Sequence, residues 1–378
     1  MFKKLVTTTA LVAAIAAGAS FSTQAKAEDI VVGIAGPMTG SLAAFGEQLR
    51  RGAELAVKDI NAKGGVLGKQ LKLVVGDDEG QPDKGPIVAN DLVKQGVSFV
   101  AGHFQSGVSI PSSAVYAEEG ILMMTPASTN VDLTDKAAEK GWKTVFRSCG
   151  RDDKQGAFAG PWIAKTYKGK KVAVLDDNSP YGAGLAKETT KAMEAAGLKP
   201  TLTEHYTHGD KDFTALLNKM KNAKIDVVYV GGYHDDQGLM LRQAHEANYK
   251  PVWISGDALN TQEFATIGGV ENTNGVRFSD ASDATKLDSA KKAVEAFRAE
   301  KYEPEGYTLP SYAAIQAFAA AANGSKSTDG AKLADWLRAN TVDTVIGKLS
   351  WDEKGDLKVA NYSWYIFQDG KYAQEATN

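Results

Sequence analysis

Residues 97–130, which read VSFVAGHFQSGVSIPSSAVYAEEGILMMTPASTN, decide the fold of this chain. The short apolar runs at 97–100 and 121–124 are typical of buried β-strands, and the segment 107–118 between them predicts a helix. Each run ends in a turn of small residues that carry hydroxyl groups. A strand, a helix and a second strand in this order predict a βαβ unit within a parallel sheet.

The two hydroxyl-bearing turns of this stretch are candidates for an anion site. Ser106 follows the first strand and Thr129 follows the second. The carboxyl ends of parallel strands form the crevice where α/β proteins bind ligands, and amides at a helix N-terminus favour an anion. We therefore expect Ser106 and Thr129 to bind a carboxylate. A purely structural interpretation is also open, with Ser106 as a helix N-cap and Ser128 and Thr129 as turn residues.

The first 27 residues are predicted to be a cleavable signal peptide. Lys3 and Lys4 precede an uncharged apolar run over residues 5–17, and Ala25-Lys26-Ala27 fits a small-residue cleavage site. The run is too short to favour a membrane span. The mature chain is expected to begin at Glu28, and a total of 378 residues suits two domains.

Charge and cysteine content argue against several classes of protein. The chain has 43 Lys and Arg residues against 46 Asp and Glu, and loss of the three leader lysines lowers the formal net charge from −3 to −6. A mildly acidic chain without a basic patch is not expected to bind nucleic acid. Cys149 is the single cysteine, so neither an internal disulfide nor a lipid anchor near the cleavage site is expected. The sequence thus predicts a free periplasmic protein, with Cys149 as a buried small hydrophobe.

Alternating strands and helices predict two lobes of similar plan. The expected strands lie at 29–35, 71–75, 97–100 and 121–124 in the first half, and at 171–175, 201–206, 225–230 and 252–255 in the second. Helices between them imply right-handed βαβ units and mostly parallel sheets. Beyond residue 276 too few strands remain for a third sheet. We expect a strand at 276–279 and hairpin strands on either side of the turn 351–356 to return to the two lobes.

Signatures of enzyme active sites are missing from the sequence. It contains no GxGxxG, GxSxG, Walker A or HExxH motif. The nearest group to a metal site is His205, His208 and Asp210, which lies beside a predicted strand end with no further ligand motif and is more typical of a solvated loop. We therefore expect no catalytic residue, no cofactor and no bound metal.

Polar and aromatic residues collect at the predicted strand ends. Six such positions stand out, three in each half: Phe45, Ser106, Thr129, Tyr181, Tyr233 and Asp257. If the two lobes face each other across a cleft, one offers hydroxyls and amides for an anion, the other offers Asp257 for a cation, and the rings suit an apolar group. The combination predicts an aliphatic amino acid as the ligand. Taken singly, the tyrosines also suit packing, and Asp257 suits the cap of a helix near Thr261.

The predicted mature chain resembles one family along essentially its whole length. The opening DIVVGIAGPMTG, the segment AELAVKDINAKGGVLGKQL, the stretch GHFQSG…EEGILMMTPAST, the run YVGGYH and the tail WDEKGDLK are similar to the periplasmic leucine/isoleucine/valine-binding proteins of ABC transporters. The resemblance implies a type I periplasmic binding protein fold. This is an α/β architecture of two Rossmann-like lobes with mostly parallel sheets, joined by three crossover segments around a ligand cleft. The crossings are expected near Arg147, near Val276 and at 347–351.

The resemblance also implies how the chain is divided and which residues bind. The first lobe would comprise 28–147 plus 277–350, and the second 148–276 plus 351–378. Ser106 and Thr129 would bind the α-carboxylate. The Ala127 carbonyl, the Thr129 hydroxyl and Asp257 would hold the α-ammonium, and the side-chain pocket would be shaped by Phe45, Phe104, Tyr181 and Tyr233. A monomer would deliver the L-amino acid to a membrane permease of an ABC transporter.

Two site positions depart from the pattern of related proteins. Phe45 stands where they often have tyrosine, and Asp257 where they often have glutamate. A disulfide found in some relatives would join the positions of Glu79 and Gln105, so it is absent here. The changes leave the choice among leucine, isoleucine, valine, alanine and threonine open, because one buried methyl group contributes only ~1 kcal/mol.

Other functions remain compatible with parts of the sequence. A receptor of the same fold for an amide, urea or an aromatic acid would use a similar cleft, although Asp257 argues for an ammonium group. A periplasmic ligand sensor would share the leader and the lobes. An enzyme would need a nucleophile and base pair that the sequence motifs do not contain.

Overall fold

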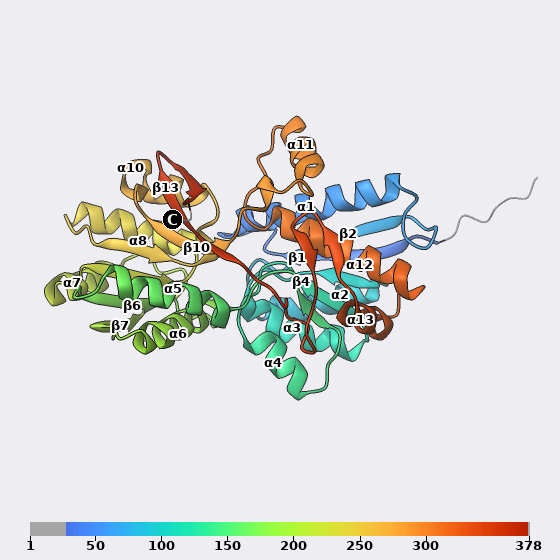
Figure 1. Cartoon of the computed structure of the whole chain (residues 1–378), viewed down its shortest axis with the longest axis horizontal. Helices are drawn as coiled ribbons and strands as arrows, with labels where there is room; N and C mark the ends of the chain where they lie inside the picture. Colours follow the sequence, from blue (N-terminus) through green and yellow to red (C-terminus); the bar gives the residue numbers. More distant parts are fainter. Residues whose placement is uncertain (1–27, 377–378) are drawn as a thin grey trace, which may run out of the picture.

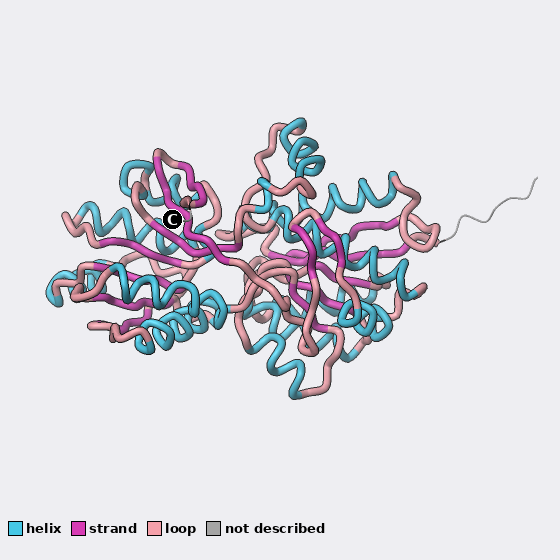
Figure 2. The backbone as a smooth tube through the Cα atoms, viewed as in Figure 1, coloured by secondary structure: helices cyan, strands magenta, loops and turns pink. Residues whose placement is uncertain are grey.

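The computed structural model describes residues 28–376 and arranges them as two α/β lobes side by side (Figure 1). This confirms the predicted two-lobed fold. The predicted signal peptide lies outside the described residues. Helices lie on both sides of the central strands in each lobe (Figure 2). Within residues 28–376, no helix has both the length and the apolar character needed to cross a bilayer.

The first lobe is built on a five-stranded parallel sheet in the order β2-β1-β3-β4-β5. Its strands are β1 (Ile30–Gly36), β2 (Leu71–Asp77), β3 (Phe99–Ala101), β4 (Leu122–Thr125) and β5 (Val145–Arg147). Six of the seven residues of β1 are buried, because helices cover both faces of the sheet. Strand β5 was not predicted, since only Val145 and Phe146 precede the charged Arg147.

Seven helices surround this sheet. They are α1 (Ala43–Ala62), α2 (Lys84–Lys94), α3 (Ser106–Glu118), α4 (Asp132–Glu139), α11 (Lys291–Ala299), α12 (Thr308–Ser325) and α13 (Gly330–Ala339). Helices α1 and α12 pack closely because Gly52 has no side chain. A Cβ atom at Gly52 would lie 2.1 Å from the Thr308 carbonyl oxygen. This contact fixes the start of α12 beside the cleft.

The second lobe repeats the strand order of the first and extends it at one edge. Its seven-stranded sheet has the order β14-β13-β10-β9-β8-β6-β7. The strands are β6 (Val172–Asp176), β7 (Leu202–His205), β8 (Val227–Gly231), β9 (Val252–Ser255), β10 (Arg277–Ala281), β13 (Tyr362–Gln368) and β14 (Lys371–Gln374). Strand β13 pairs antiparallel with both β10 and β14, so the C-terminal strands complete this sheet.

The helices of the second lobe follow the same alternation. They are α5 (Asp152–Thr166), α6 (Pro180–Ala195), α7 (Thr214–Ala223), α8 (His234–Glu246), α9 (Glu263–Gly268) and α10 (Val270–Thr273), with the short 3-10 helices η1 (Asp257–Leu259) here and η2 (Ala284–Lys286) after β10. Ser179 caps α6 by accepting a hydrogen bond from the Gly182 amide, and Pro180 occupies its first turn. The start of α6 contacts the other lobe, because the Pro180 carbonyl accepts from Asn130.

The second and third crossings differ from the prediction. Strand β10 pairs with β9 of the second sheet, so the chain leaves that lobe after Ala281 and not at Val276. The turn 351–357 stays on the first lobe, where the Gly355 carbonyl accepts from the Arg147 amide. The third crossing therefore follows residue 357. The predicted boundaries at 277 and 351 are wrong because strand pairing and this turn contact, neither visible in local sequence, decide which lobe holds each segment.

The expected hairpin on either side of the turn 351–356 is also wrong. Strand β12 (Gly347–Leu349) pairs with β11 (Val342–Thr344) in a separate two-stranded sheet. Strand β13 pairs instead with β10 and β14. A polar turn between two apolar runs predicts that the runs pair with each other as a hairpin. Here the crossing between the lobes places the two strands in different sheets.

Candidate ligand-binding site

Six of the eight predicted binding residues line one small space between the lobes. They are Phe104, Ser106, Ala127, Tyr181, Tyr233 and Asp257, which Ala258 and Tyr307 join. The space measures about 10 Å³, enough for a single water molecule at most. The described structure is therefore a closed arrangement. A ligand as large as an amino acid requires the lobes or the rings to move apart.

Ser106 borders the small space and does not cap helix α3. Helix α3 begins at Ser106 itself, and Gln105 is the N-cap residue. The Ser106 hydroxyl accepts a 3.2 Å hydrogen bond from the Asn130 amide. This bond brings the end of β3 against the turn that follows β4, as the sequence predicted. The N-cap interpretation of Ser106 is wrong.

The turn after β4 presents one buried hydroxyl with no partner. The Thr129 Oγ1 atom is buried and makes no hydrogen bond to any described residue. Thr129 borders the larger cavity behind Asp257 and not the small space. Ser128, in contrast, has a structural role, because its hydroxyl donates to the Phe104 carbonyl at 2.8 Å. The turn-residue interpretation therefore holds for Ser128.

Arg147 binds the backbone of this turn. Its guanidinium donates to the carbonyls of Ser128 at 2.7 Å and Asn130 at 3.1 Å. The Nε atom lies 2.6 Å from Asp356 Oδ1, and both side chains are almost fully buried. Asp356 also pairs with Arg151 at 2.6 Å. The turn 351–357 thus supplies the counter-charge for the arginine that orients the site.

Asp257 lies at the opposite side of the small space and is bound by two tyrosines. Tyr181 donates to its Oδ1 at 3.0 Å, and Tyr307 donates to its Oδ2 at 2.6 Å. Burial raises the pKa of Asp257, although the hydrogen bonds from Tyr307, Gln155 and Tyr181 act in the opposite direction. The helix that follows is α9, where Thr261 accepts from the Glu263 amide. Asp257 is therefore not its cap.

Aromatic rings of both lobes meet above Asp257. Phe45 is fully buried and stacks on Phe104, with 4.5 Å between ring centroids. Phe104 in turn contacts Tyr307 edge-on at 5.1 Å and Tyr233 at 6.1 Å. Phe45 does not border either space, so it supports Phe104 from behind in this closed arrangement. The predicted rings lie together and pack on one another, and their role as a side-chain pocket stays a prediction.

Several contacts join the two lobes directly across the cleft. Tyr307, the N-cap residue of α12 in the first lobe, donates to Asp257 of the second. Asn130 donates to the Pro180 carbonyl at 2.5 Å. Phe45 packs edge-on against His234, with 4.9 Å between ring centroids. Because these contacts break when the lobes separate, they stabilise the closed arrangement over an open one.

Comparisons with known proteins agree with this geometry. A family profile described as periplasmic binding protein matches residues 29–371. The chain belongs to this family. An amino acid binding protein of Pseudomonas aeruginosa is 46% identical over 377 residues, which cover 99% of this chain and 100% of that protein. The Leu/Ile/Val-binding protein homolog 2 of Brucella abortus is 45% identical over 348 residues, or 91% of this chain and 92% of the relative.

Solved structures show the same architecture. The branched-chain amino acid transporter substrate-binding protein LivJ of Streptococcus pneumoniae, in complex with isoleucine, superposes with a TM-score of 0.83 at 29% identity, covering 92% of this chain and 99% of LivJ. The leucine-binding protein LivK of Thermotoga maritima has a TM-score of 0.84 at 27% identity, with coverage of 92% and 98%. The type I periplasmic binding fold expected from the sequence is confirmed.

Sequence reasoning missed Tyr307 and the buried pair of Arg147 and Asp356 in this binding protein. Tyr307 lies after the charged segment 300–305 and before an apolar helix, with no strand end to mark it. A signal existed for Asp356, since the polar turn WDEKGD directly follows a short strand and carries three acids. Only the three-dimensional structure shows that one of these acids reaches Arg147.

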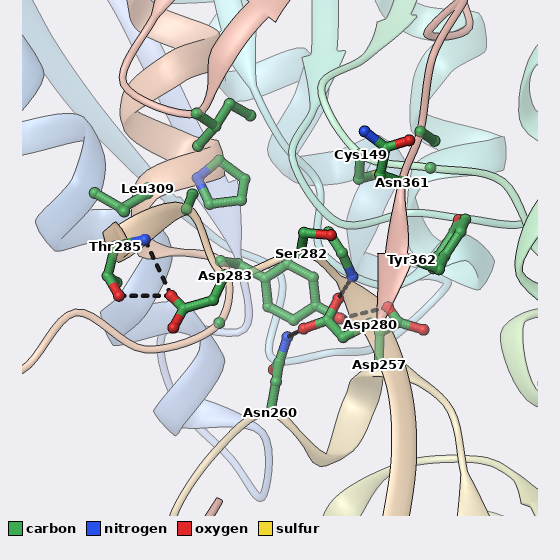
Figure 3. Close-up of a pocket in the computed structure, with 18 of the residues that line it drawn as sticks. Cys149, Asp257, Asn260, Asp280, Ser282, Asp283, Thr285, Leu309, Asn361 and Tyr362 are labelled. Carbon is green, nitrogen blue, oxygen red and sulfur yellow. Dashed lines mark hydrogen bonds between the residues drawn. The ribbon is translucent and has the colours of Figure 1, made fainter. Parts of the chain in front are cut away.

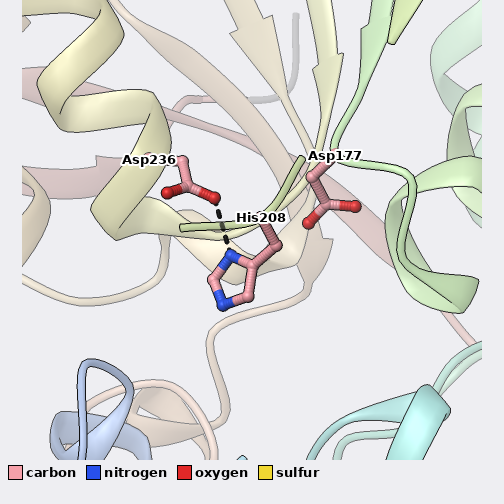
Figure 4. A group of neighbouring side chains, drawn as sticks. All are labelled: Asp177, His208 and Asp236. Carbon is pink, nitrogen blue, oxygen red and sulfur yellow. Dashed lines mark hydrogen bonds and ion pairs between the residues drawn. The ribbon is translucent and has the colours of Figure 1, made fainter. Parts of the chain in front are cut away.

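A group that includes His208 has the geometry of a possible metal site (Figure 4). Ligand atoms of Asp177, His208 and Asp236 lie within 4.8 Å of one another. His208 Nδ1 is already 2.6 Å from Asp236 Oδ2, so an ion would have to displace that proton. The predicted trio is different, because His205 pairs with Asp176 and the Asp210 carboxylate accepts from the Thr207 amide.

Stability should depend on the protonation of His208. Burial disfavours its imidazolium, but the Asp236 hydrogen bond and the charges of Asp236, Asp235 and Asp177 outweigh this and raise the pKa to about 8. A histidine whose folded pKa exceeds the unfolded one stabilises fully below the unfolded pKa of about 6.5. We expect about 1–2 kcal/mol of stability to be lost as the pH rises through 8.

Chemical unfolding at pH 6 and pH 9 measures this effect. The difference in the free energy of unfolding between the two pH values should be smaller in the His208→Gln variant, because glutamine has no proton to release. His205→Gln is the matched control, since the His205 side chain is 63% exposed. An equal pH dependence in the wild type and in His208→Gln would contradict the assignment.

Proposed function

We propose that this protein is the substrate-binding component of an ABC importer. It binds a branched-chain or other aliphatic L-amino acid between its lobes and delivers it to a membrane permease. One observation carries the proposal: Ser106 and Ala127 of one lobe border the same space as Asp257 of the other. A hydroxyl and amides opposite a carboxylate suit a zwitterion. The printed names of the relatives from Brucella abortus and Streptococcus pneumoniae support the choice of ligand.

Each group of the amino acid has a partner in this proposal. The α-carboxylate accepts from the Ser106 hydroxyl and from the amides at the start of α3 and in the Thr129 turn. The α-ammonium donates to Asp257, to the Ala127 carbonyl and to the Thr129 hydroxyl, which has no partner among the described residues. The aliphatic side chain lies against Phe104, Tyr181 and Tyr233, with Phe45 behind Phe104.

Lobe closure is coupled to binding because the partners lie on different lobes. A ligand that contacts both lobes at once favours the closed arrangement over the open one by its difference in affinity. The bond from Tyr307 to Asp257 stabilises closure in the same direction. The proposed cycle ends when the permease accepts the closed form and opens it. No step in the cycle alters a covalent bond of the ligand, so the protein acts as a receptor and not as an enzyme.

The cellular setting follows from the same proposal. Residues 1–27 direct export and are removed, and the mature protein diffuses in the periplasm as a monomer. A monomeric carrier suits this task, since the permease must reach the face on which both lobes meet.

Thermal unfolding of the mature protein tests the proposal in one plate. The ligands are the twenty amino acids, with urea, acetamide, benzoate and 4-aminobutyrate. A ligand that binds only the folded state, at 100 times its dissociation constant, adds about 2.7 kcal/mol of stability. We expect leucine, isoleucine or valine to raise the melting temperature. A plate in which no amino acid does so would overturn the proposal.

A second candidate is a receptor of the same fold for a smaller ligand such as an amide or urea. Such a ligand needs less separation of the lobes than leucine does, because the space beside Phe104 and Tyr233 measures about 10 Å³. A neutral ligand would also leave the buried Asp257 carboxyl in its existing bonds to Tyr181 and Tyr307. A thermal shift with acetamide or urea and none with amino acids would select this candidate.

A further inference from the structure

A second, much larger cavity lies among the segments that connect the lobes. It has a volume of about 530 Å³, which is within the range of about 300–1,000 Å³ typical of ligand pockets. The crossings line it at Ser148–Gly150, at 280–285, at Leu357 and at 359–362. Figure 3 shows Asp257, Asp280 and Asn260 close together at one end of this cavity. The cavity is distinct from the small space beside Ser106, which shares only Asp257 and Tyr307 with it.

Acidic side chains outnumber basic ones on the wall of this cavity. Five acids border it, Asp257, Asp280, Asp283, Glu303 and Glu305, against a single cation, Lys348. Glu303 and Asp283 pair with Arg298 and Lys286, and Lys348 pairs with Asp343 outside the cavity. Among residues 28–376, neither Asp257 nor Asp280 makes an ion pair with any Lys, Arg or His.

Asp257 and Asp280 destabilise each other's charge. Burial raises the pKa of Asp280 to about 8, and the negative charge of Asp257 adds to the effect. Asp280 has one side-chain donor, the Asn260 amide at 2.8 Å. Two carboxyl groups at one end of a cavity with no cation between them favour a positively charged ligand, because its charge would relieve both the repulsion and the cost of burial.

Hydrogen-bond acceptors also exceed donors on this wall. Gln155 Oε1 and Asn260 Oδ1 accept only, are buried, belong to residues that border the cavity and have no partner among the described residues. The two residues are at most 2% exposed. Three hydroxyls that line the cavity are already used, since Ser148, Tyr362 and Tyr372 donate to the carbonyls of Pro310, Arg151 and Asn260. A ligand that fits must therefore donate several hydrogen bonds.

Apolar residues complete the wall away from the carboxyl groups. They are contributed by the second and third crossings, the start of α12 and the segment at β12: Leu287, Leu309, Ile346, Leu349, Leu357 and Val359. Such a surface suits methylene groups. The cavity thus combines an acidic, acceptor-rich end with an apolar flank.

We propose that this cavity binds a small organic cation, namely an ammonium group on a short alkyl chain, with the charged end between Asp257 and Asp280. The proposal does not require that the protein binds leucine. Because the cavity is lined by all three crossings, a bound cation would contact the segments that bend when the lobes move. It would also compete with an α-ammonium for the charge of Asp257, so occupation should weaken the binding of an amino acid.

Isothermal titration of the full mature protein with 1,4-diaminobutane tests the proposal at 150 mM salt, where weak surface attraction is screened. The control ligand is 1,4-butanediol, which has the same length and no charge. We expect saturable binding of the diamine at one site and none of the diol. This comparison needs no variant. Equal behaviour of the two compounds, or no binding of either, would overturn the proposal.

Variants then locate the site. Asp280→Asn should weaken diamine binding at least tenfold, since it removes a carboxyl group that a bound cation would ionise and keeps the shape of the side chain. Asp335→Asn is the matched control, because Asp335 is exposed on α13 and borders neither space. Diamine affinity that is the same in both variants would place the diamine elsewhere and reject the cavity.

Failure of this proposal and failure of the leucine proposal give different results. Ser106→Ala should abolish leucine binding and keep diamine binding, because Ser106 does not border the larger cavity. A protein that binds the diamine and no amino acid would reject the leucine proposal alone. A protein that binds leucine and no diamine would reject the cavity proposal alone.

Discussion

The Asp257→Asn variant should bind leucine about 100-fold more weakly than the wild type, because a hydrogen bond to a charged group contributes about 1.5–3 kcal/mol. The substitution keeps the shape of the side chain and one oxygen that can accept from Tyr181 or Tyr307. It removes the charge that faces the α-ammonium, and its amide nitrogen cannot accept from the second tyrosine. Titration calorimetry of the two proteins with leucine measures the ratio of dissociation constants.

The same variant should be no less stable than the wild type in the absence of ligand. Burial raises the pKa of Asp257, so its ionised form lowers the stability of the folded protein at neutral pH. A neutral asparagine removes this cost, which offsets the loss of one tyrosine hydrogen bond. Asp257→Glu is the control that retains the charge, and it should bind leucine more tightly than Asp257→Asn. Wild-type affinity in Asp257→Asn would exclude Asp257 as the ammonium partner.

Loss of Asp356 is expected to have the largest effect on stability. Asp356→Ala should lower the free energy of unfolding by about 3–5 kcal/mol, because it leaves the buried Arg147 without its counter-charge. Binding should weaken as well, since Arg147 orients the carbonyls of Ser128 and Asn130 beside the site. Denaturant unfolding followed by tryptophan fluorescence is a direct measurement, because Trp351 is buried in the same turn and donates to the Arg147 carbonyl.

A surface ion pair provides the comparison for Asp356. Asp343 pairs with Lys348 at 2.6 Å, with side chains that are 83% and 73% exposed. Asp343→Ala should change the free energy of unfolding by less than about 1 kcal/mol, as is usual for exposed pairs. Similar losses in Asp356→Ala and Asp343→Ala would mean that the turn 351–357 does not depend on its buried charge. If Asp356→Ala fails to fold, Asp356→Asn tests the charge with less change in volume.

Much of the candidate site could be predicted because its residues follow predictable strands. Ser106 comes after β3, and Tyr233 after β8, and the carboxyl ends of parallel strands meet at one edge of a sheet. The strand assignment alone was therefore enough to predict that each residue lies at the binding edge of its sheet. Phe45 and Thr129 were placed less well, since Phe45 packs behind Phe104 and Thr129 borders the larger cavity. Their positions depend on how closely the lobes approach, which no local pattern encodes.

Tyr307 shows the limit of this reasoning most clearly. It donates to Asp257, a residue 50 positions away on the other lobe. Its place depends on the packing of α12 against α1, where Gly52 admits the Thr308 carbonyl. The pair of Arg147 and Asp356 likewise joins segments that are distant in sequence. In both cases the contact exists only after two separately folded segments have been packed together.

The sequence by itself determined the alternation of strands and helices, the two parallel sheets and the polar strand ends, because each depends on residues that are close in the chain. Tertiary structure alone decided where the second and third crossings leave each lobe, which tyrosines hold Asp257, and which acid neutralises Arg147. These features depend on contacts between distant segments, and such contacts form only when the lobes pack and close.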